Sequence, residues 1–178
     1  MPEFVVLLRA VNVGGRPLKM ADARKVLSDN GFDAVQSHIQ TGNFLVRSPM
    51  RSDVKVEDEV ARLLSSHAGF AIVAVARKPA ELASLVEAVD GIPAPEGGRA
   101  RYVTFLTKAP TGPAARELES LDIEGERAHV IGKDVLVDYA VAFHEARLTG
   151  ARIERTLGVP GTARNMTVVR KLAEKWGQ

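Results

Sequence analysis

The chain has 178 residues and a mass of 19.2 kDa, enough for one ordinary domain or two small ones. Its 46% hydrophobic and 26% charged residues are typical of a globular protein and exclude a disordered or fibrous chain. The absence of cysteine excludes disulfides, thiolate metal ligands and cysteine nucleophiles. The formal net charge of +2 is too small to indicate a nucleic-acid-binding protein by itself.

The start of the sequence shows no targeting signal. Met1-Pro2-Glu3 leads directly into an apolar run, without the basic stretch or the cleavage site of a signal peptide. The longest apolar run, over 70–76, is far shorter than the roughly 18 residues that a membrane-spanning helix needs. We therefore expect a cytoplasmic protein that does not insert into a membrane.

The first half of the chain predicts alternating strands and helices. The continuous apolar run over 3–9 is typical of a strand buried on both faces, and the helical spacing of apolar residues in 20–27 predicts a helix. Alternation over 35–46 predicts a hairpin with a Thr-Gly turn. A helix over 56–64 and a buried strand over 70–76 complete the order β-α-β-β-α-β.

The second half repeats this order less clearly. A helix starts at Pro79, and two prolines and three glycines make 91–98 the predicted linker. No final strand is expected, and a last helix over 169–176 is expected to pack across the protein body. The expected elements between linker and last helix are a strand over 102–106, a helix over 111–121, a hairpin over 130–137 and a helix over 153–157.

The order β-α-β-β-α-β is that of the ferredoxin-like split βαβ fold. We therefore predict an α+β protein of two ferredoxin-like halves, each with an antiparallel sheet and helices packed on one face, plus a C-terminal helix. The predicted organisation is a βαββαβ subdomain over 1–78, a connecting helix and linker over 79–98, and a βαββα subdomain with C-terminal helices over 99–178. The internal repeat is one of topology and not of residues.

The sequence contains none of the strong motifs of catalysis or cofactor binding. The four histidines are too scattered for a zinc pair, and there is no P-loop, nucleophile elbow or dinucleotide fingerprint. The adjacent carboxylates Glu57, Asp58 and Glu59 are interpreted as a solvated helix face. The sequence predicts neither a metal nor a cofactor, and it leaves open whether the protein is an enzyme.

A polar, glycine-containing loop between the first strand and the first helix is the first candidate site. It contains Arg9, Asn12, Gly14 and Gly15. Two adjacent glycines allow backbone N–H groups to turn toward one concavity, and the helix that follows directs its positive end there, so the loop is suited to an anion. In the alternative interpretation the glycines only permit a tight turn that Asn12 caps.

The tip of the first hairpin is the second candidate, with Gln40, Thr41 and Asn43. Glycine and asparagine are also ordinary turn residues, so this cluster can be purely structural. In a split βαβ unit the first two strands run parallel, and the end of the first strand and the hairpin tip therefore emerge at the same edge of the sheet. We expect the two clusters to form one polar pocket.

The third candidate cluster precedes the last helix and contains Thr162, Arg164 and Asn165. Thr162 or Asn165 can serve as the helix cap. Arg164 opposes the helix dipole at this position, which favours an anion or carboxylate between them. His38, near the hairpin tip, is either an acid or base of the same pocket or an ordinary surface histidine.

The sequence resembles the bacterial domain-of-unknown-function 1697 family in three segments that occur in order. The resemblance covers nearly the whole chain and implies tandem ferredoxin-related halves, with no established activity to transfer. The chain departs from the family at His38, where an aromatic residue is usual, and at Met166, where a tryptophan is usual. The segments that carry the resemblance are Leu7–Gly15, His38–Asn43 and Ile153–Asn165.

These clusters lead us to expect a protein that binds a small anionic ligand, such as a nucleotide or phosphometabolite. The alternative is a nucleic-acid-binding or protein-interaction module without catalysis. The third strand, over 43–47, lacks the aromatic stacking motif of RNA-recognition domains, and only 5% of all residues are aromatic, so nucleic acid is not favoured. The +2 sum also hides an asymmetry, because 147–178 carry +5 and 1–146 carry −3. The basic end is compatible with an anionic partner.

Overall fold

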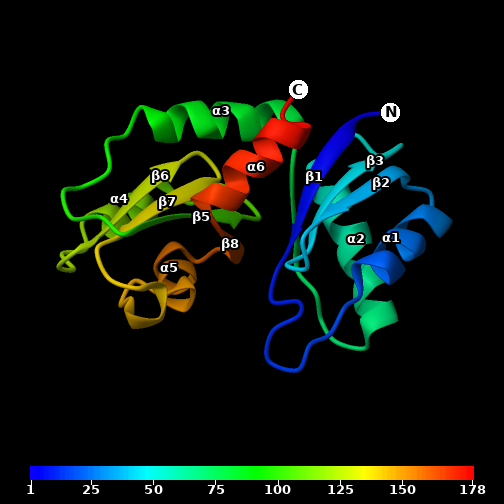
Figure 1. Cartoon of the computed structure of the whole chain (residues 1–178), viewed down its shortest axis with the longest axis horizontal. Coiled ribbons are helices and arrows are strands. Elements are labelled where there is room, and N and C mark those ends of the chain that lie inside the picture. The colour runs from blue at the N-terminus through cyan, green and yellow to red at the C-terminus, as the bar shows by residue number, and fades with distance from the viewer. The chain divides into compact units, whose positions relative to one another are not determined.

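The chain forms two units, and the computed structural model describes all residues from 1 to 178 (Figure 1). Unit 1 comprises residues 1–82 and 176–178, and unit 2 comprises residues 83–175. The elements of unit 1 are, in chain order, β1 (Glu3–Leu8), α1 (Met20–Asp29), β2 (Asp33–His38), β3 (Asn43–Arg47), α2 (Asp53–Ala68) and β4 (Ala74–Arg77). They form an antiparallel sheet with the strand order β2-β3-β1-β4.

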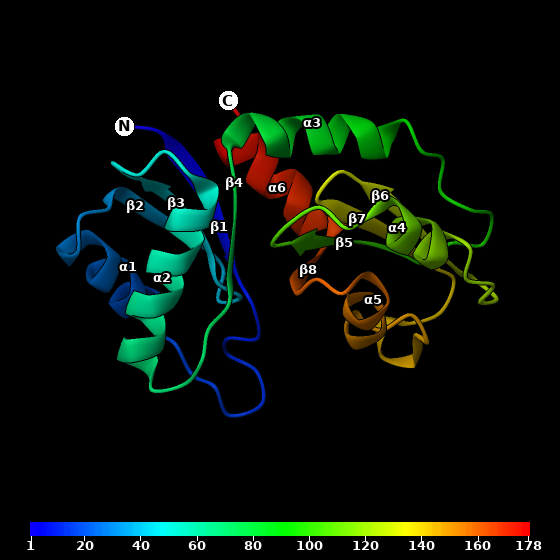
Figure 2. The ribbon, with the colours of Figure 1, turned by 180° about the vertical axis from the view of Figure 1, so that it is seen from behind.

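The first strand of unit 1 is buried on both faces, as its unbroken apolar run predicts. Phe4, Val6 and Leu8 contact the core formed with α1 and α2, while Val5 and Leu7 on the opposite face are also fully buried. Figure 2 shows α1 and α2 side by side on one face of this sheet. The arrangement of two helices on one face of four antiparallel strands is the one predicted for this half.

The fourth strand of unit 1 is shorter than the apolar run over 70–76 suggests, because it begins only at Ala74. The backbone N–H of Ile72 donates to the Ser65 Oγ of α2 at 2.8 Å. That backbone group is therefore satisfied by a helix side chain and not by a neighbouring strand. Gly69, with a φ of 80°, ends α2 in the left-handed conformation that glycine adopts without strain.

The helix α3 (Pro79–Asp90) leads from unit 1 into unit 2, and residues 91–99 follow without regular structure. The sheet of unit 2 has the strand order β6-β7-β5-β8, again antiparallel throughout. The elements after the linker are β5 (Ala100–Leu106), α4 (Gly112–Glu119), β6 (Glu126–Ile131), β7 (Asp134–Tyr139), the 3₁₀ turn η1 (Phe143–Glu145), α5 (Gly150–Leu157), β8 (Gly161–Asn165) and α6 (Met166–Trp176).

The strand β8 was not expected from the sequence. Its five residues, Gly-Thr-Ala-Arg-Asn, lack both an apolar run and a clear alternation, so neither strand signal is present. The pairing with β5 is nevertheless regular over all five residues. Unit 2 therefore has the complete order β-α-β-β-α-β, and the prediction of two ferredoxin-like halves is confirmed.

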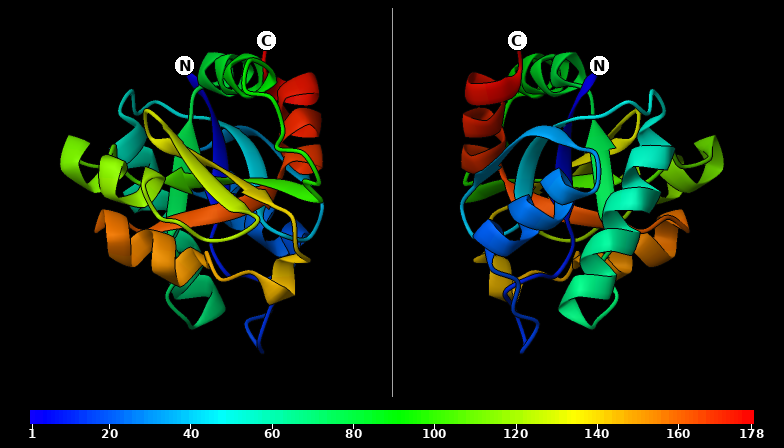
Figure 3. Two further views of the ribbon diagram at one scale, coloured as in Figure 1. Left: turned by 90° about the vertical axis from the view of Figure 1, so that its left-hand side faces the viewer. Right: turned by 90° about the vertical axis from the view of Figure 1, so that its right-hand side faces the viewer.

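The helices of unit 2 lie on both sides of its sheet. Figure 3 shows α4 and α5 next to each other on one side, and α3 and α6 on the other. Leu118 and Ile153 join α4 and α5 to the core with Val135, Val137 and Leu106 of the sheet. None of the helices combines the length and the apolar character that crossing a membrane requires.

The carboxyl end of α3 is attached to the sheet of unit 2 by one arginine. Arg101 on β5 donates to Asp138 on β7, with Nε 2.6 Å from Oδ1 and Nη2 3.2 Å from Oδ2. Its Nη2 also donates to the Ile92 carbonyl at 2.9 Å, just beyond the helix end. A guanidinium at this position complements the negative end of the helix dipole while its charge is balanced by Asp138.

Candidate functional site

The loop between β1 and α1 has an unusual backbone. Four of its residues adopt the left-handed conformation: Ala10 with a φ of 53°, Asn12 with 57°, Gly14 with 55° and Gly15 with 75°. For residues other than glycine this conformation costs about 1–2 kcal/mol each, although asparagine tolerates it better than alanine does. The loop therefore keeps its shape only because other interactions hold it.

Asn12 supplies those interactions through both ends of its side-chain amide. Its Oδ1 accepts the backbone N–H of Leu18 at 2.8 Å, and its Nδ2 donates to the Leu18 carbonyl at 2.9 Å. The same Nδ2 donates to the carbonyl of Gln40 at 2.6 Å. Asn12 thus closes the loop on itself and attaches it to the tip of the β2–β3 hairpin.

The hairpin tip is shaped to meet this loop. Gly42 has a φ of 85°, and its carbonyl accepts the N–H of Leu8 at 2.8 Å. A Cβ at Gly42 would lie 2.8 Å from the Leu8 Cβ and 2.9 Å from Val11 Cγ2, so only glycine fits there. The buried Asn43 donates to the His38 carbonyl and to Thr41 Oγ1, both at 3.0 Å. The first two predicted clusters therefore lie together at one edge of the unit 1 sheet.

Three successive N–H groups at the apex of the loop point to no protein acceptor. The N–H of Asn12 donates to the Arg16 carbonyl at 2.7 Å, and that of Arg16 donates to the Val13 carbonyl at 3.1 Å. The N–H groups between them, on Val13, Gly14 and Gly15, have no hydrogen-bond partner within the described chain. Left-handed glycines next to a residue of ordinary φ are the geometry in which successive N–H groups form an anion-binding concavity.

Arg16 places a fixed positive charge at the end of the loop. Its Cζ lies 4.9 Å from the centre of the Phe70 ring, and its Nη2 donates to the Ala71 carbonyl. Its Nε is buried and has no hydrogen-bond partner. The residues of 9–19 include Arg9, Arg16 and Lys19 but no acidic side chain, so the loop carries a formal charge of +3.

Arg16 is not among the site residues that the sequence predicts. A guanidinium held by an aromatic face and a carbonyl retains other N–H groups for a ligand, whereas Asn12 has committed its amide to the loop. The sequence signal was weak, because Phe70 lies 54 positions from Arg16 and their contact exists only in the folded chain.

Unit 2 shows that the fold does not require this loop. The equivalent connection between β5 and α4 spans only 107–111 and contains no residue with positive φ. There Thr111 caps the helix directly, since its Oγ1 accepts the N–H of Ala114 at 3.3 Å. The second hairpin also turns within two residues, Gly132 and Lys133. The longer loop and wider hairpin of unit 1 are thus additions to a shared topology.

The third predicted cluster lies in unit 2, on β8 and not in a loop. Arg164 is 7% exposed, and its Nη1 donates to Thr162 Oγ1 at 2.8 Å and to the Ala163 carbonyl at 2.9 Å. Burial lowers the pKa of Arg164 to about 10, so the side chain is still charged at neutral pH. Asn165 Oδ1 accepts the N–H of Thr167 at 2.8 Å, which makes Asn165 a cap of α6.

His38 lies edge-on to Trp176, with ring centres 6.4 Å apart. The sequence interpretation of the Glu57–Glu59 run as solvated is wrong for Glu57, which is buried and accepts the Ala76 N–H at 2.8 Å. No group of three or more potential metal ligands is arranged to hold an ion. The N–H groups of the loop, with Arg16 next to them in the chain, are suited to an anion.

Comparisons with known proteins agree with this fold. A family model described as "Protein of unknown function (DUF1697)" matches residues 1–136. A solved structure described as that of conserved bacterial protein SP0830 from Streptococcus pneumoniae is similar with a TM-score of 0.68 and 19% identity, over 100% of this chain and 99% of that one. At that identity the likeness shows the fold alone. No curated protein matches. The match to more than half of its residues shows that the chain belongs to the DUF1697 family.

Proposed function

We propose that unit 1 binds a small anionic ligand, inorganic phosphate or a phosphate-bearing metabolite such as a nucleotide, at the β1–α1 loop and the hairpin tip. The observation that carries the proposal is the row of unpartnered N–H groups on Val13, Gly14 and Gly15. It occurs in a loop that unit 2 replaces with a short connection. A strained segment that the fold does not need is best explained by a ligand that it binds.

Charge supports the same ligand class. The loop carries +3 without an acidic residue, and the α1 helix that follows starts without a side-chain cap at Lys19. Oxygen atoms of a phosphate accept hydrogen bonds from backbone N–H groups and from guanidinium groups, and a helix amino end adds to the attraction. The loop thus offers donors of several kinds and no carboxylate that would repel an anion.

Each predicted residue then has a distinct role. The N–H groups of Gly14 and Gly15 contact the anion, and Arg9 and Arg16 neutralise its charge. Asn12 and Asn43 hold the two loops in position through their own hydrogen bonds, and Gln40 and Thr41 form the exposed rim. Participation of Thr162, Arg164 and Asn165 in the same ligand site stays a prediction.

A nucleic-acid ligand has less support than a small anion. RNA-recognition sheets stack bases on aromatic side chains of the face opposite their helices. In unit 1 that face carries Val5, Leu7 and Leu45, which are aliphatic and buried. The two central strands of this face therefore offer no aromatic platform for base stacking, whereas the loop can bind a phosphate without one.

The proposal is tested by titrating the ¹⁵N-labelled protein with phosphate, pyrophosphate and adenosine monophosphate. We expect the amide resonances of Val13, Gly14 and Gly15 to shift first. In a thermal unfolding assay, a hundredfold excess of ligand over its Kd should stabilise the protein by about 2.7 kcal/mol. The double variant Gly14→Ala/Gly15→Ala should weaken binding at least about tenfold, because two left-handed alanines reopen the loop.

A matched control separates binding from stability. Gly132 in unit 2 has a φ of 61° and, like Gly14 and Gly15, has open space where a Cβ would lie. Gly132→Ala should therefore cost about 1 kcal/mol of stability and leave ligand binding unchanged. Absence of any amide shift in the loop with all three anions, or equal binding by the Gly14→Ala/Gly15→Ala variant, would contradict the proposal.

A further inference from the structure

The strand β6 is the outer strand of the unit 2 sheet, and its free side is open. It pairs with β7 over six consecutive residues without a register shift. The Ala140 N–H donates to the Gly125 carbonyl at 2.6 Å, which identifies 125 and 140 as a hydrogen-bonded pair. Because such pairs alternate along an antiparallel ladder, Ala128 and Val130 direct their N–H and C=O groups away from β7.

These outward groups have no other backbone partner. The N–H of Glu126, at the start of the strand, donates to the Ile123 carbonyl at 3.0 Å, so it is not free to pair with an added strand. No such bond involves Ala128 or Val130 on their outer side. The open length of the edge thus begins at Ala128.

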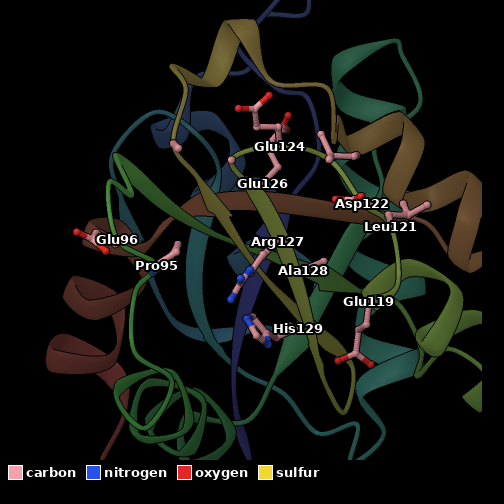
Figure 4. Close-up of a pocket in the computed structure, with 13 residues that line it drawn as sticks. Pro95, Glu96, Glu119, Leu121, Asp122, Glu124, Glu126, Arg127, Ala128 and His129 are labelled. Atoms are coloured by element: carbon pink, nitrogen blue, oxygen red, sulfur yellow. The ribbon is translucent and has the colours of Figure 1, made fainter.

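A hollow of about 580 Å³ lies along this edge. In Figure 4, the β6 residues Arg127, Ala128 and His129 lie in the middle of the hollow, with the linker residues Pro95 and Glu96 on one side and Glu119, Leu121 and Asp122 on the other. Two walls beside an unpaired strand form a trough in which an extended segment can lie alongside β6.

The rim of the hollow is acidic. Glu96, Glu119, Asp122 and Glu124 line it and are exposed, whereas Arg127 is the single lysine or arginine among the lining residues. Glu126 also lines it, but its carboxylate accepts the N–H groups of Arg147 and Leu148. The exposed charge therefore attracts a basic occupant.

The other edges of the two sheets carry side chains that block strand addition. On β4 the outward N–H of Ala76 donates to Glu57, and on β8 the N–H of Gly161 donates to Glu154 at 2.6 Å. The register of β2 is interrupted between Asp33 and Gln36. Bulges and covering side chains are common means of protecting an edge, and β6 has neither.

We propose that β6 binds an extended basic segment of a partner protein by strand addition. The main chain of that segment would pair with Ala128 and Val130, and its lysine or arginine side chains would face Glu96, Glu119 and Asp122. A second copy of this chain is a poor occupant, because pairing two β6 edges would bring the same exposed carboxylates together.

The test uses three hexapeptides with blocked ends: alternating Lys-Val, alternating Glu-Val, and the Lys-Val peptide with every residue N-methylated. We expect amide shifts at Ala128 and Val130 with the first peptide only, since the second is repelled and the third has no N–H group to donate to β6. Raising the salt concentration to screen the rim should weaken the binding of the first peptide several-fold.

Two sets of variants locate the interaction. Val130→Pro removes an outward N–H without touching the bonds to β7, so it should keep the fold and weaken peptide binding about tenfold. Glu119→Gln/Asp122→Asn should weaken it several-fold, while the control Asp58→Asn/Glu87→Gln, at exposed positions elsewhere, should not. If Val130→Pro fails to fold, the N-methylated peptide provides the same test.

Three results would overturn strand addition. Equal binding of the N-methylated peptide would show that main-chain pairing is not involved. Binding of spermine as tight as that of the Lys-Val peptide would point to a polyamine site. A dimer of the chain in sedimentation experiments that Val130→Pro dissociates would show that β6 pairs with itself. All three are independent of phosphate binding in unit 1.

Discussion

Units 1 and 2 have the same strand order, so a comparison of the two identifies features that occur in one unit and are not needed for the shared fold. Unit 1 has a long β1–α1 loop with four left-handed residues. The equivalent connection of unit 2, residues 107–111, is short and contains no left-handed residue. Unit 2 has a regular, open β6, whereas the equivalent β2 is interrupted. Features present in one unit alone are not needed for the fold, and these are the two places where we propose ligands.

Features present in both units belong to the fold itself. Arg77 pairs in register with Val5, and Arg164 pairs with Val103 at the equivalent position. Each arginine donates through Nη1 to the carbonyl of the alanine before it, at 2.8 Å and 2.9 Å respectively. A glutamate on the second helix of each unit accepts an N–H from the fourth strand. The repeat therefore extends to residues, and the prediction of a repeat of topology alone is wrong at these positions.

The largest effect should come from a position at which the two units differ. Gly161 pairs with Leu106, and the equivalent partner of Leu8 in unit 1 is Ala74. A Cβ at Gly161 would lie 2.6 Å from the Phe105 carbonyl oxygen, so Gly161→Ala should destabilise the protein by about 3 kcal/mol. The measurement is the urea midpoint of each variant.

The reverse substitution is the control. Ala74→Gly removes one buried methyl group and should cost only about 1–2 kcal/mol. A Gly161→Ala variant as stable as the parent would mean that β5 and β8 can separate without loss. In that case β8 would not need the close contact with β5 that its glycine allows, and β4 and β8 would not differ in how tightly they pack.

Those regions that bury apolar residues on a regular spacing could be predicted from the sequence. The strand β1 and the helices α1 and α2 follow directly from apolar patterns that hold over several turns or residues. The strand β8 could not be predicted in this way, because its pairing depends on β5, which is more than fifty positions away in the chain. Long-range pairing overrides local pattern there.

The candidate site was predictable in its location and not in its roles. Topology brings the loop and the hairpin tip to one edge, and the glycines mark both. Which residues contact the ligand and which hold the loops depends on hydrogen bonds that sequence spacing does not predict, such as those from Asn12 to Leu18 and Gln40. Arg16 became a candidate only through its contacts with Phe70 and Ala71.

The shared glutamates should differ in their contribution to stability according to their burial. Glu57 is 7% exposed and Glu154 is partly exposed. Glu57→Ala should therefore cost about 2 kcal/mol and Glu154→Ala about 1 kcal/mol, because the Glu57 hydrogen bond is buried and the Glu154 hydrogen bond is only partly buried. Hydrogen exchange of the Ala76 and Gly161 amides gives a local measurement. An equal loss in both variants would show that burial does not determine the contribution.

Asn12 in the β1–α1 loop and Thr111 in the β5–α4 connection hold equivalent connections of the two units. Their alanine variants should differ little in stability and strongly in phosphate binding. Asn12→Ala removes three hydrogen bonds at an exposed position and should cost about 1.5 kcal/mol, while Thr111→Ala removes one helix cap and should cost about 1 kcal/mol. Only Asn12→Ala should abolish phosphate binding. Thermal unfolding with and without phosphate measures both effects, and loss of binding in Thr111→Ala would contradict a site confined to unit 1.

The smallest effects are expected at two exposed ion pairs, one in each unit. A hydrogen bond from Arg62 lowers the pKa of the Glu59 carboxyl, and one from Arg170 lowers the pKa of Asp90. Since each pKa is lower in the folded than in the unfolded protein, the stabilisation is present above the unfolded pKa and disappears as the pH falls through the folded one. Glu59→Gln and Asp90→Asn should therefore differ from the parent only slightly at neutral pH and not at all in acid.

Carboxyl ¹³C titration with and without added salt measures both pairs directly. Both pKa values should rise toward their ordinary range as salt screens the arginines, because exposed pairs interact mainly through solvent. The Asp90–Arg170 pair joins α3 to α6, whereas Glu59 and Arg62 lie one turn apart on α2. Local unfolding that separates α3 from α6 would therefore raise the pKa of Asp90 alone. A salt response confined to Asp90 would show that the pair on α2 does not form in solution.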